Sequence, residues 1–452
     1  MATLDLKPLI NTLPAIDPLK VYGRVTEITG MIIKATGIKA SVGESCRILS
    51  DNGLTIEAEV VGFRDDKVLL MAINDITGVR PGSRVISIGR KVSVRVSDSI
   101  IGRILNDRGE PIDGKGSISG VDYPLTVHLP PPHPLRRRRI TEPLDLGIRA
   151  INGLMTIGKG QRVGIMAGSG VGKSVLLGMI ARFTEAPVSV IALIGERGRE
   201  VREFIENNLG EEGLKKSIVV VSTSDQPPLA KVRGAFTATA IAEYFRDRGM
   251  DVLLLMDSLT RVAQAQREIG LATGEPPTSK GYTPSVFSLL PRLLERVGTA
   301  ENGGSITGIY TVLVEGDDLS EPVADAVRAI LDGHIVLSRE LAMEGLYPSI
   351  DVLQSISRVM PDIVEERHRE LASRFVELMA TYKRFEDMIN LGAYKAGTNP
   401  KLDKAIEMID KLRSYIRQDM RNRRDFTDSL QGLYLIFEEG IRNHQLKACK
   451  YN

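Results

Sequence analysis

The chain has 452 residues and a nearly balanced charge, with a formal net value of +2 at pH 7. This length corresponds to about three domains, and the balanced charge argues against a protein that binds nucleic acid over its whole surface. The two cysteines, Cys46 and Cys449, lie far apart, so we expect neither a disulfide framework nor a cysteine metal cluster, which fits a reducing cytosol. No stretch is long and apolar enough to span a bilayer.

The N-terminal residues 1–20 are interrupted by Pro8, Pro14 and Pro18. They lack the basic start and the continuous apolar core of a secretory signal peptide. We therefore expect a soluble cytoplasmic protein, which would reach a membrane only through a partner.

Residues 21–89 alternate apolar and polar side chains in short runs, which are separated by glycine-containing turns. This pattern predicts a small all-β barrel or sandwich. A link follows that is rich in proline at residues 130–134 and ends in arginines at residues 136–139. Because no aromatic side chains interleave these arginines, we expect them to be solvated or paired at an interface rather than to bind nucleic acid.

Residues 144–357 alternate strand-like and helix-like segments. The strand-like runs cover residues 187–195, 217–222, 252–257, 305–314 and 334–337. Such alternation predicts a mostly parallel sheet covered by helices. Beyond Pro361 the apolar residues follow helical spacing over residues 363–391 and 400–440. The fold class is therefore α/β multidomain, with a barrel, a domain built on a parallel sheet and a helical domain in that order.

Residues 167–174 read AGSGVGKS and lie between a strand-like and a helix-like run, which cover residues 161–166 and 174–183. In such a loop glycines let the backbone N–H groups turn towards phosphates, Lys173 supplies a mobile positive charge, and Ser174 places a hydroxyl on Mg²⁺. Ala167 replaces the glycine of the strict pattern, and the glycines that follow supply the flexibility. The segment predicts a nucleoside triphosphate site, with a Gly/Ser-rich surface turn as the alternative.

Two further apolar runs end in charged residues and should reach the same edge of the sheet. The run DVLLLMD ends in Asp257, a carboxylate placed to hold the shell of Mg²⁺ through water. Another run is followed by Glu196 and Arg197, which would position the attacking water and contact the outer phosphate. A loop of surface ion pairs is the alternative for these two residues.

Tyr347 and Arg358 come late in the same region. Tyr347 could stack on the base or serve as a packing residue. Arg358 could be structural or could complete a neighbouring subunit's site, as arginine fingers do. Sequence spacing leaves both questions open.

Together these segments resemble the catalytic subunits of rotary ATPases, and more closely the ATPases of flagellar protein export and type III secretion. The resemblance is carried by AGSGVGKS at 167–174, GERGREV at 195–201, STSDQPPLA at 222–230, DSLTR at 257–261, GEPP at 274–277 and GYTPSVF at 281–287. It extends over nearly the whole chain and implies an N-terminal β-barrel, a central RecA-like P-loop ATPase domain and a C-terminal α-helical domain. The predicted bounds are 1–20 for an N-terminal partner-binding segment, 21–92 for the barrel, 93–360 for the ATPase domain and 361–452 for the helical domain.

The resemblance further implies a homohexamer that binds ATP and Mg²⁺ at its subunit interfaces. The implied nucleotide-binding residues are Gly168, Ser169, Gly170, Val171, Gly172, Lys173, Ser174, Val175 and Tyr347, with Tyr347 on the adenine. The implied catalytic residues are Lys173, Glu196, Arg197 and Arg358, with Arg358 reaching the next subunit's ATP. Ser174 and Asp257 match the Mg²⁺ groups, Asp257 through water. Non-catalytic subunits of the rotary family carry Gln where this chain has Glu196, which favours an active enzyme.

The family also implies partners. They are further copies of this chain, a stator-like regulator at residues 1–20, a central stalk protein, export-gate membrane proteins, and export substrates with their chaperones; no nucleic acid is expected. These partners would hold the protein peripherally at the inner face of the cytoplasmic membrane. The basic stretch between Lys401 and Arg424 could meet an acidic stalk or gate component, or form a solvated helix face.

Two other functions stay open. One is the catalytic subunit of an ion-translocating rotary ATP synthase, which would need a non-catalytic sister subunit. The other is a nucleotide-dependent ring scaffold without turnover. Residues 280–284 and 316–322 favour flagellar over virulence-associated secretion.

Overall fold

The computed structural model describes residues 21–50, 53–73, 76–89, 93–125, 131–314 and 318–448, with side chains up to residue 437. The predicted partner-binding segment at residues 1–20 and Cys449 lie outside these described residues. The chain divides into two compact units. One unit holds the chain before residue 93 together with Leu271–Glu275, and the other holds Ser93–Gly270 and the chain from Pro276 onwards.

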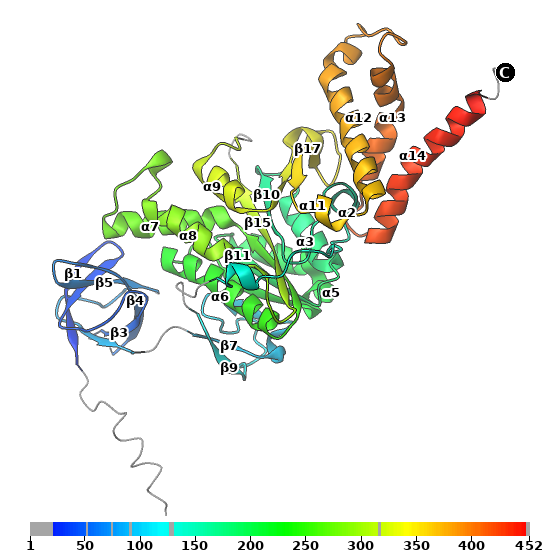
Figure 1. The fold of residues 1–452 in the computed structure, drawn as a ribbon. Helices are drawn as coiled ribbons and strands as arrows, with labels where there is room; N and C mark the ends of the chain where they lie inside the picture. Colours follow the sequence, from blue (N-terminus) through cyan, green and yellow to red (C-terminus); the bar gives the residue numbers. More distant parts are fainter. Residues whose placement is uncertain are drawn as a thin grey trace, which may run out of the picture. The chain divides into compact units, whose positions relative to one another are not determined.

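The smaller unit is a closed barrel with the strand order β1-β2-β5-β4-β3-β6 (Figure 1). Its strands are β1 (Gly23–Thr29), β2 (Ile32–Thr36), β3 (Ser45–Leu49), β4 (Thr55–Arg64), β5 (Lys67–Ala72) and β6 (Arg84–Ser87). Inward-facing apolar side chains fill the interior, among them Val25, Ile33, Ile48, Leu70 and Val85. Of the two all-β architectures predicted, the barrel is the one that forms.

The larger unit is built on a sheet with the strand order β17-β16-β10-β15-β13-β11-β12-β8. These strands are β8 (Ile104–Asn106), β10 (Arg162–Ala167), β11 (Val188–Ile194), β12 (Ser217–Ser222), β13 (Asp251–Asp257), β15 (Ser305–Leu313), β16 (Gly333–Leu337) and β17 (Ile350–Ser357). Neighbours from β16 to β8 run parallel, whereas β17 runs antiparallel to β16. The predicted mostly parallel sheet is confirmed, and the predicted runs match β11, β12, β13, β15 and β16 to within one residue at each end.

Three short strands complete the larger unit. β14 (Gly298–Thr299) pairs antiparallel with β15, and β7 (Ser93–Val96) pairs with β9 (Val121–Pro124) in a separate two-stranded sheet. Short 3₁₀ turns are η2 (Asp98–Ile100), η3 (Pro134–Arg136) and η5 (Ser279–Gly281). Of these turns, η3 lies in the proline-rich link.

Helices cover the parallel sheet (Figure 1). They are α2 (Arg149–Leu154), α3 (Lys173–Phe183), α4 (Gly198–Glu203), the π-helical turn η4 (Phe204–Leu209), α5 (Gly210–Lys215), α6 (Pro228–Asp247), α7 (Leu259–Thr273), α8 (Pro284–Leu294), α9 (Pro322–Ile330) and α10 (Arg339–Met343). α6 packs on β11, β12 and β13. Its small buried residues Ala235, Ala238 and Ala242 let the helix lie close to the strands.

Beyond β17 the described chain is helical, as predicted. The helices are α11 (Met360–Ile363), α12 (Glu366–Asn390), α13 (Pro400–Ile416) and α14 (Phe426–Ala448). α12 and α13 pack side by side, and α14 packs on α2 (Figure 1). The predicted domain boundary between residues 360 and 361 falls inside α11 and inside the larger unit, and it stays a prediction. Over the described residues, no helix is both long and apolar enough to cross a bilayer.

The helical run predicted over residues 400–440 is wrong in its middle, because the chain is not helical between α13 and α14. Gln418 is the physical reason. Its backbone N–H donates to the carbonyl of Tyr347 at 2.9 Å, and its side-chain Nε2 donates to the carbonyl of Gly147 at 2.8 Å. A continuous α-helix would use that backbone N–H internally.

The arginine run at residues 136–139 is paired within the chain at Arg137. The Arg137 guanidinium donates to the carbonyl of Val297 at 2.9 Å and forms an ion pair with Glu295 at 3.4 Å. Burial lowers the pKa of Arg137, and the Glu295 charge opposes this. The link before the parallel sheet is therefore tied to the segment between α8 and β15.

Glu243 on α6 and Arg296 form an ion pair in the interior of the larger unit. Arg296 is 0% and Glu243 is 4% exposed, and the Arg296 Nε donates to Glu243 Oε1 at 2.8 Å. Removal of one partner of a buried pair leaves the other charge without its counterion, which costs about 3–5 kcal/mol.

We expect Glu243→Gln to lower the free energy of unfolding by about 3–5 kcal/mol. The matched control is Glu212→Gln, which breaks an exposed ion pair with Lys215 and should cost less than about 1 kcal/mol. Chemical denaturation followed by circular dichroism measures both losses. Equal losses in the two variants would contradict the interior role of this pair.

Candidate nucleotide-binding and catalytic site

The segment at residues 167–174, called the phosphate-type loop below, connects β10 to α3. The predicted strand and helix that flank it are confirmed. Gly170 and Gly172 have φ angles of +79° and +87°. These lie in the left-handed region, where a Cβ causes strain, so the backbone of this loop requires glycine. Gly172 also caps the N-terminus of α3, where backbone N–H groups are available for an anion.

A cavity of about 700 Å³ opens at this loop, which is a suitable size for a nucleotide. Of the predicted site residues, it is lined by Gly168, Ser169, Gly170, Gly172, Lys173, Ser174, Val175, Glu196 and Arg197. Val171 is buried instead, and its carbonyl accepts a hydrogen bond from Ser349 Oγ at 2.6 Å. Val171 therefore supports the loop from behind, while the other loop residues face the cavity.

Lys173 lies between two carboxylates. Its Nζ forms a short ion pair with Asp257 and a second ion pair with Glu196 at 3.7 Å. Asp257 is 4% exposed, and its Oδ1 also accepts a hydrogen bond from Thr311 Oγ1 at 2.7 Å. The ends of β10, β11 and β13 thus bring together the three charged residues that sequence reasoning placed at one sheet edge.

The pKa of Glu196 is raised from its ordinary value to about 7. Burial is the main cause, and repulsion by Asp257 adds to it, while Lys173 opposes both. A hydrogen bond with Glu200 raises the pKa of Glu196 further. A carboxylate whose pKa is near neutral pH is well matched to accept a proton from water.

Glu200 and Arg197 form a second charged pair at the cavity wall. They interact at 3.7 Å, and the Arg197 side chain is 78% exposed. Burial pushes the pKa of Glu200 up, but hydrogen bonds from Glu196 and from the Arg197 backbone N–H bring it below its ordinary value. The surface ion pair considered for this loop therefore exists, and it lies at the cavity rather than away from it.

The residues present fit Mg²⁺. Within the described ranges, no group of three or more His, Cys, Asp and Glu side chains could hold a metal ion alone. Ser174 is exposed in the cavity and Asp257 lies behind Lys173. Mg²⁺ typically takes one or two protein groups and completes its shell with water and substrate phosphates, which agrees with this sparse donor set.

Tyr347 lies beside the phosphate-type loop of its own chain. A Cβ on Gly172 would be 3.4 Å from the Tyr347 ring, and the Tyr347 side chain is 45% exposed. Its backbone carbonyl is held by the Gln418 N–H described above. A half-exposed ring at this position can stack on a base, and it is not enclosed as a core packing residue would be.

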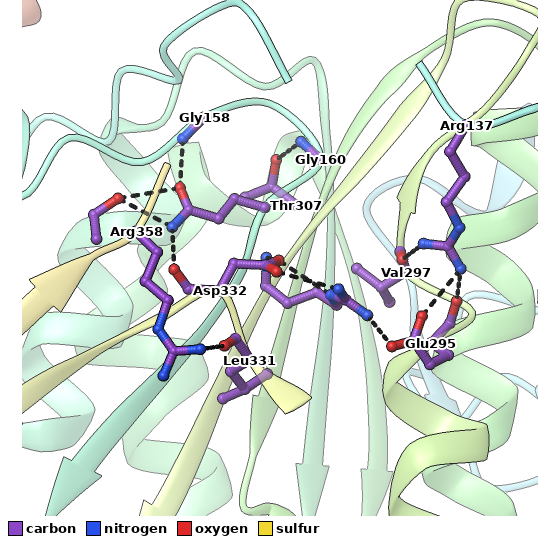
Figure 2. A network of polar contacts seen from close by, with 12 residues as sticks. Arg137, Gly158, Gly160, Glu295, Val297, Thr307, Leu331, Asp332 and Arg358 are labelled. Atoms are coloured by element: carbon purple, nitrogen blue, oxygen red, sulfur yellow. Dashed lines mark hydrogen bonds and ion pairs between the residues drawn. The ribbon is translucent and has the colours of Figure 1, made fainter. Parts of the chain in front are cut away.

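Arg358 and the cavity lie at opposite ends of the strands of the sheet. Leu337 of β16 pairs with Ala167 of β10 next to the loop, whereas the other end of β16 pairs with Ser357, directly before Arg358. β10 has six residues and so spans about 20 Å between these edges. Arg358 is exposed, and Figure 2 shows its guanidinium directed towards the carbonyl of Leu331, to which it donates at 3.5 Å. Arg358 is therefore not part of its own chain's cavity.

Several residues that line the cavity were not predicted as site residues from the sequence. They are Glu200, Ser224, Lys231, Arg261, Gln264 and Glu268. Arg261 had a signal, since it ends the DSLTR segment that begins at Asp257. Gly195 has a φ of +72°, and a Cβ there would lie 2.7 Å from the Cβ of Arg261, so the close approach of these two residues requires glycine at position 195. Glu200 had a similar signal, since it lies in the GERGREV segment at 195–201. Thr311 had no signal of comparable strength, because its role depends on tertiary contacts.

Comparison with known proteins agrees with this geometry. Residues 147–357 match the nucleotide-binding domain of the ATP synthase alpha/beta family, and residues 25–89 match the β-barrel domain of that family. Residues 364–434 match the T3SS EscN ATPase C-terminal domain.

Curated relatives are similar over nearly their full length. A flagellum-specific ATP synthase of Bacillus subtilis is 53% identical over 92% of this chain and 95% of its own. A type 3 secretion system ATPase of Xanthomonas euvesicatoria is 49% identical over 92% of this chain and 94% of its own. The assembled ATPase EscN from enteropathogenic E. coli superposes with a TM-score of 0.87 at 45% identity, over 92% of this chain and 99% of that one. EscN in complex with its central stalk EscO gives a TM-score of 0.84 at 44% identity over the same shares.

We expect the pH profile of ATP hydrolysis to report the ionisation of Glu196. Because the carboxylate form is the one that accepts a proton, kcat/KM should rise as the pH rises through about 7 and level off above it. Steady-state assays with Mg²⁺ in excess over ATP measure this profile. A profile that stays flat from well below to well above that value would contradict the role of Glu196 as base.

Glu200→Gln should move this acidic limb to lower pH, because it removes the negative charge and carboxylate that favour protonated Glu196. The control is Glu206→Gln, which breaks an exposed pair with Arg202 and should leave the limb in place. An unmoved limb in Glu200→Gln would rule out the coupling between the two glutamates.

Proposed function

This chain belongs to the family of flagellar and type III secretion ATPases, and we propose that it hydrolyses ATP at homohexamer interfaces to drive delivery, chaperone release or unfolding of export substrates. Its ATPase activity follows from the family. The observation that most supports the ring is the position of Arg358. One chain holds a cavity for ATP at one edge of its sheet and an exposed arginine at the other edge, about 20 Å away.

The cavity residues suit phosphoryl transfer to water. The loop N–H groups and Lys173 bind the outer phosphates, and Arg197 contacts the outermost one. Glu196 orients a water molecule and accepts its proton while the water oxygen bonds to the γ-phosphorus and the bond to the bridging oxygen breaks. Ser174, and Asp257 through water, would hold Mg²⁺, which neutralises charge on the phosphate oxygens.

ATP binding would rearrange the ion pairs around Lys173. The Lys173 ammonium neutralises Asp257 and partly neutralises Glu196. Phosphates would draw Lys173 towards the loop and leave Asp257 available for the Mg²⁺ shell.

The remaining partners follow from the family. We infer a stator-like regulator at residues 1–20, a central stalk protein, export-gate membrane proteins and export substrates with chaperones, with the ring held at the inner face of the cytoplasmic membrane. EscN has been described both assembled and with its central stalk. The match of residues 364–434 to an EscN C-terminal domain favours secretion over a role as catalytic subunit of an ion-translocating synthase.

We expect Glu196→Gln to keep ATP binding and to lose turnover, because glutamine preserves the shape of the side chain but cannot accept the proton from water. A fluorescent ATP analogue measures binding, and phosphate release measures turnover. Lys173→Ala should weaken both. Near-normal hydrolysis by Glu196→Gln would contradict the catalytic assignment.

We expect Arg358→Ala to bind ATP but to hydrolyse it poorly in the assembled ring. Mixed with Lys173→Ala, it should regain part of its activity, because one chain then supplies an intact cavity and the other an intact Arg358. Phosphate release at varied mixing ratios measures the rescue. No rescue at any ratio would contradict action of Arg358 on a neighbouring subunit.

A further inference from the structure

Gln161 is a fully buried polar residue directly before β10, and nothing in the proposed chemistry uses it. Its Oε1 accepts a hydrogen bond from the backbone N–H of Gly158 at 2.8 Å. Its Nε2 donates to the carbonyl of Asp332 at 3.2 Å and to Ser357 Oγ at 3.0 Å. A buried amide is costly unless it is hydrogen-bonded, and here both ends of the side chain are engaged.

Two of these contacts converge on Arg358. The carbonyl of Asp332 that accepts from Gln161 also accepts from the backbone N–H of Arg358, at 2.9 Å. Figure 2 places Gly158, Asp332 and Arg358 close together in one polar network. Gln161 therefore fixes the acceptor that holds the Arg358 backbone.

Ser357, the residue before Arg358, is held by hydrogen bonds of its own side chain. Its Oγ donates to the carbonyl of Thr156 at 2.7 Å and accepts from the backbone N–H of Met360 at 3.2 Å. The Gln161 amide donates to the same oxygen. The chain is thus fixed immediately before and after Arg358, while the Arg358 side chain itself stays exposed.

The packing around Gln161 leaves little freedom. A Cβ on Gly333 would lie 3.3 Å from Gln161 Nε2 and 2.5 Å from the carbonyl of Ile356, so only glycine allows β16 and β17 to approach this closely. The Asp332 carboxylate is held separately by Arg162, at 3.1 Å to its Nε. Ser357 Oγ lies within hydrogen-bond distance of both ends of the Gln161 amide, at 3.0 Å from Nε2 and 3.4 Å from Oε1.

We propose that Gln161 is a positioning residue that fixes the backbone at the end of β17, so that Arg358 is presented to the nucleotide of the neighbouring subunit. This rests on the proposed action of Arg358 in trans. An arginine that must meet a transferring phosphoryl group from another chain gains from a fixed backbone, because misplacement by about 1 Å can cost about a hundredfold in rate.

The test places Gln161→Leu on one chain or the other of the rescued mixture. On the Lys173→Ala chain, which supplies Arg358, it should lower the rescued activity about tenfold to a hundredfold. On the Arg358→Ala chain, which supplies the cavity, it should leave the rescued activity unchanged within about twofold, since Gln161 lies about 20 Å from that cavity.

Each outcome has a distinct meaning. No rescue in the starting mixture contradicts the trans role of Arg358 and not the geometry of Gln161. Rescue that falls equally in both arrangements shows a general structural role and overturns the inference, as does rescue that falls in neither.

Two further variants keep the test decisive. Ser357→Ala removes the oxygen that Gln161 contacts and should reproduce the same asymmetry, even if Gln161→Leu does not fold. Gln354→Leu is the matched control, because Gln354 is an exposed glutamine on β17 whose Nε2 donates to the nearby Asp351 carboxylate at 2.8 Å. It should have no effect in either arrangement.

Discussion

The parallel register of the central sheet is the constraint on which the site depends. β10, β11 and β13 all end at one edge, so Lys173 meets Asp257 across 84 residues of sequence. It also meets Glu196, which follows β11, the strand next to β13. Two carboxylates share one ammonium in a mostly buried setting, so one negative charge is in excess while Glu196 is ionised. Burial of these groups together costs less free energy than burial of three separate charges. The Lys173–Asp257 ion pair can therefore lie next to Glu196, whose carboxyl group has a raised pKa.

The same sheet carries one strand that reverses this direction. β17 begins near the phosphate-type loop, where Tyr347 lies beside Gly172, and ends at the far edge, at Arg358. Tyr347 and Arg358 are near in sequence but serve opposite edges.

Much of this was accessible from the sequence, and the reason is local. Strands such as β12 and the run from β10 through the loop into α3 are specified by continuous apolar stretches and by glycines with positive φ, which are properties of neighbouring residues. The break between α13 and α14 was not accessible, because Gln418 leaves the helical pattern for carbonyls of Tyr347 and Gly147. Thr311 was missed for the same reason, since only the fold brings it to Asp257.

Gln161 illustrates why a polar residue inside the fold can matter as much as one in the cavity. In the sequence Gln161 is only the first residue of a strand-like run. Its importance depends on the fold, because the carbonyl of Asp332 accepts hydrogen bonds from both Gln161 and the Arg358 backbone. A leucine of similar size would fill the space but leave that carbonyl and the Gly158 N–H with fewer partners. β10, which directly follows Gln161, ends in the chain's own phosphate-type loop, so one strand connects the residue that fixes the Arg358 backbone with the cavity.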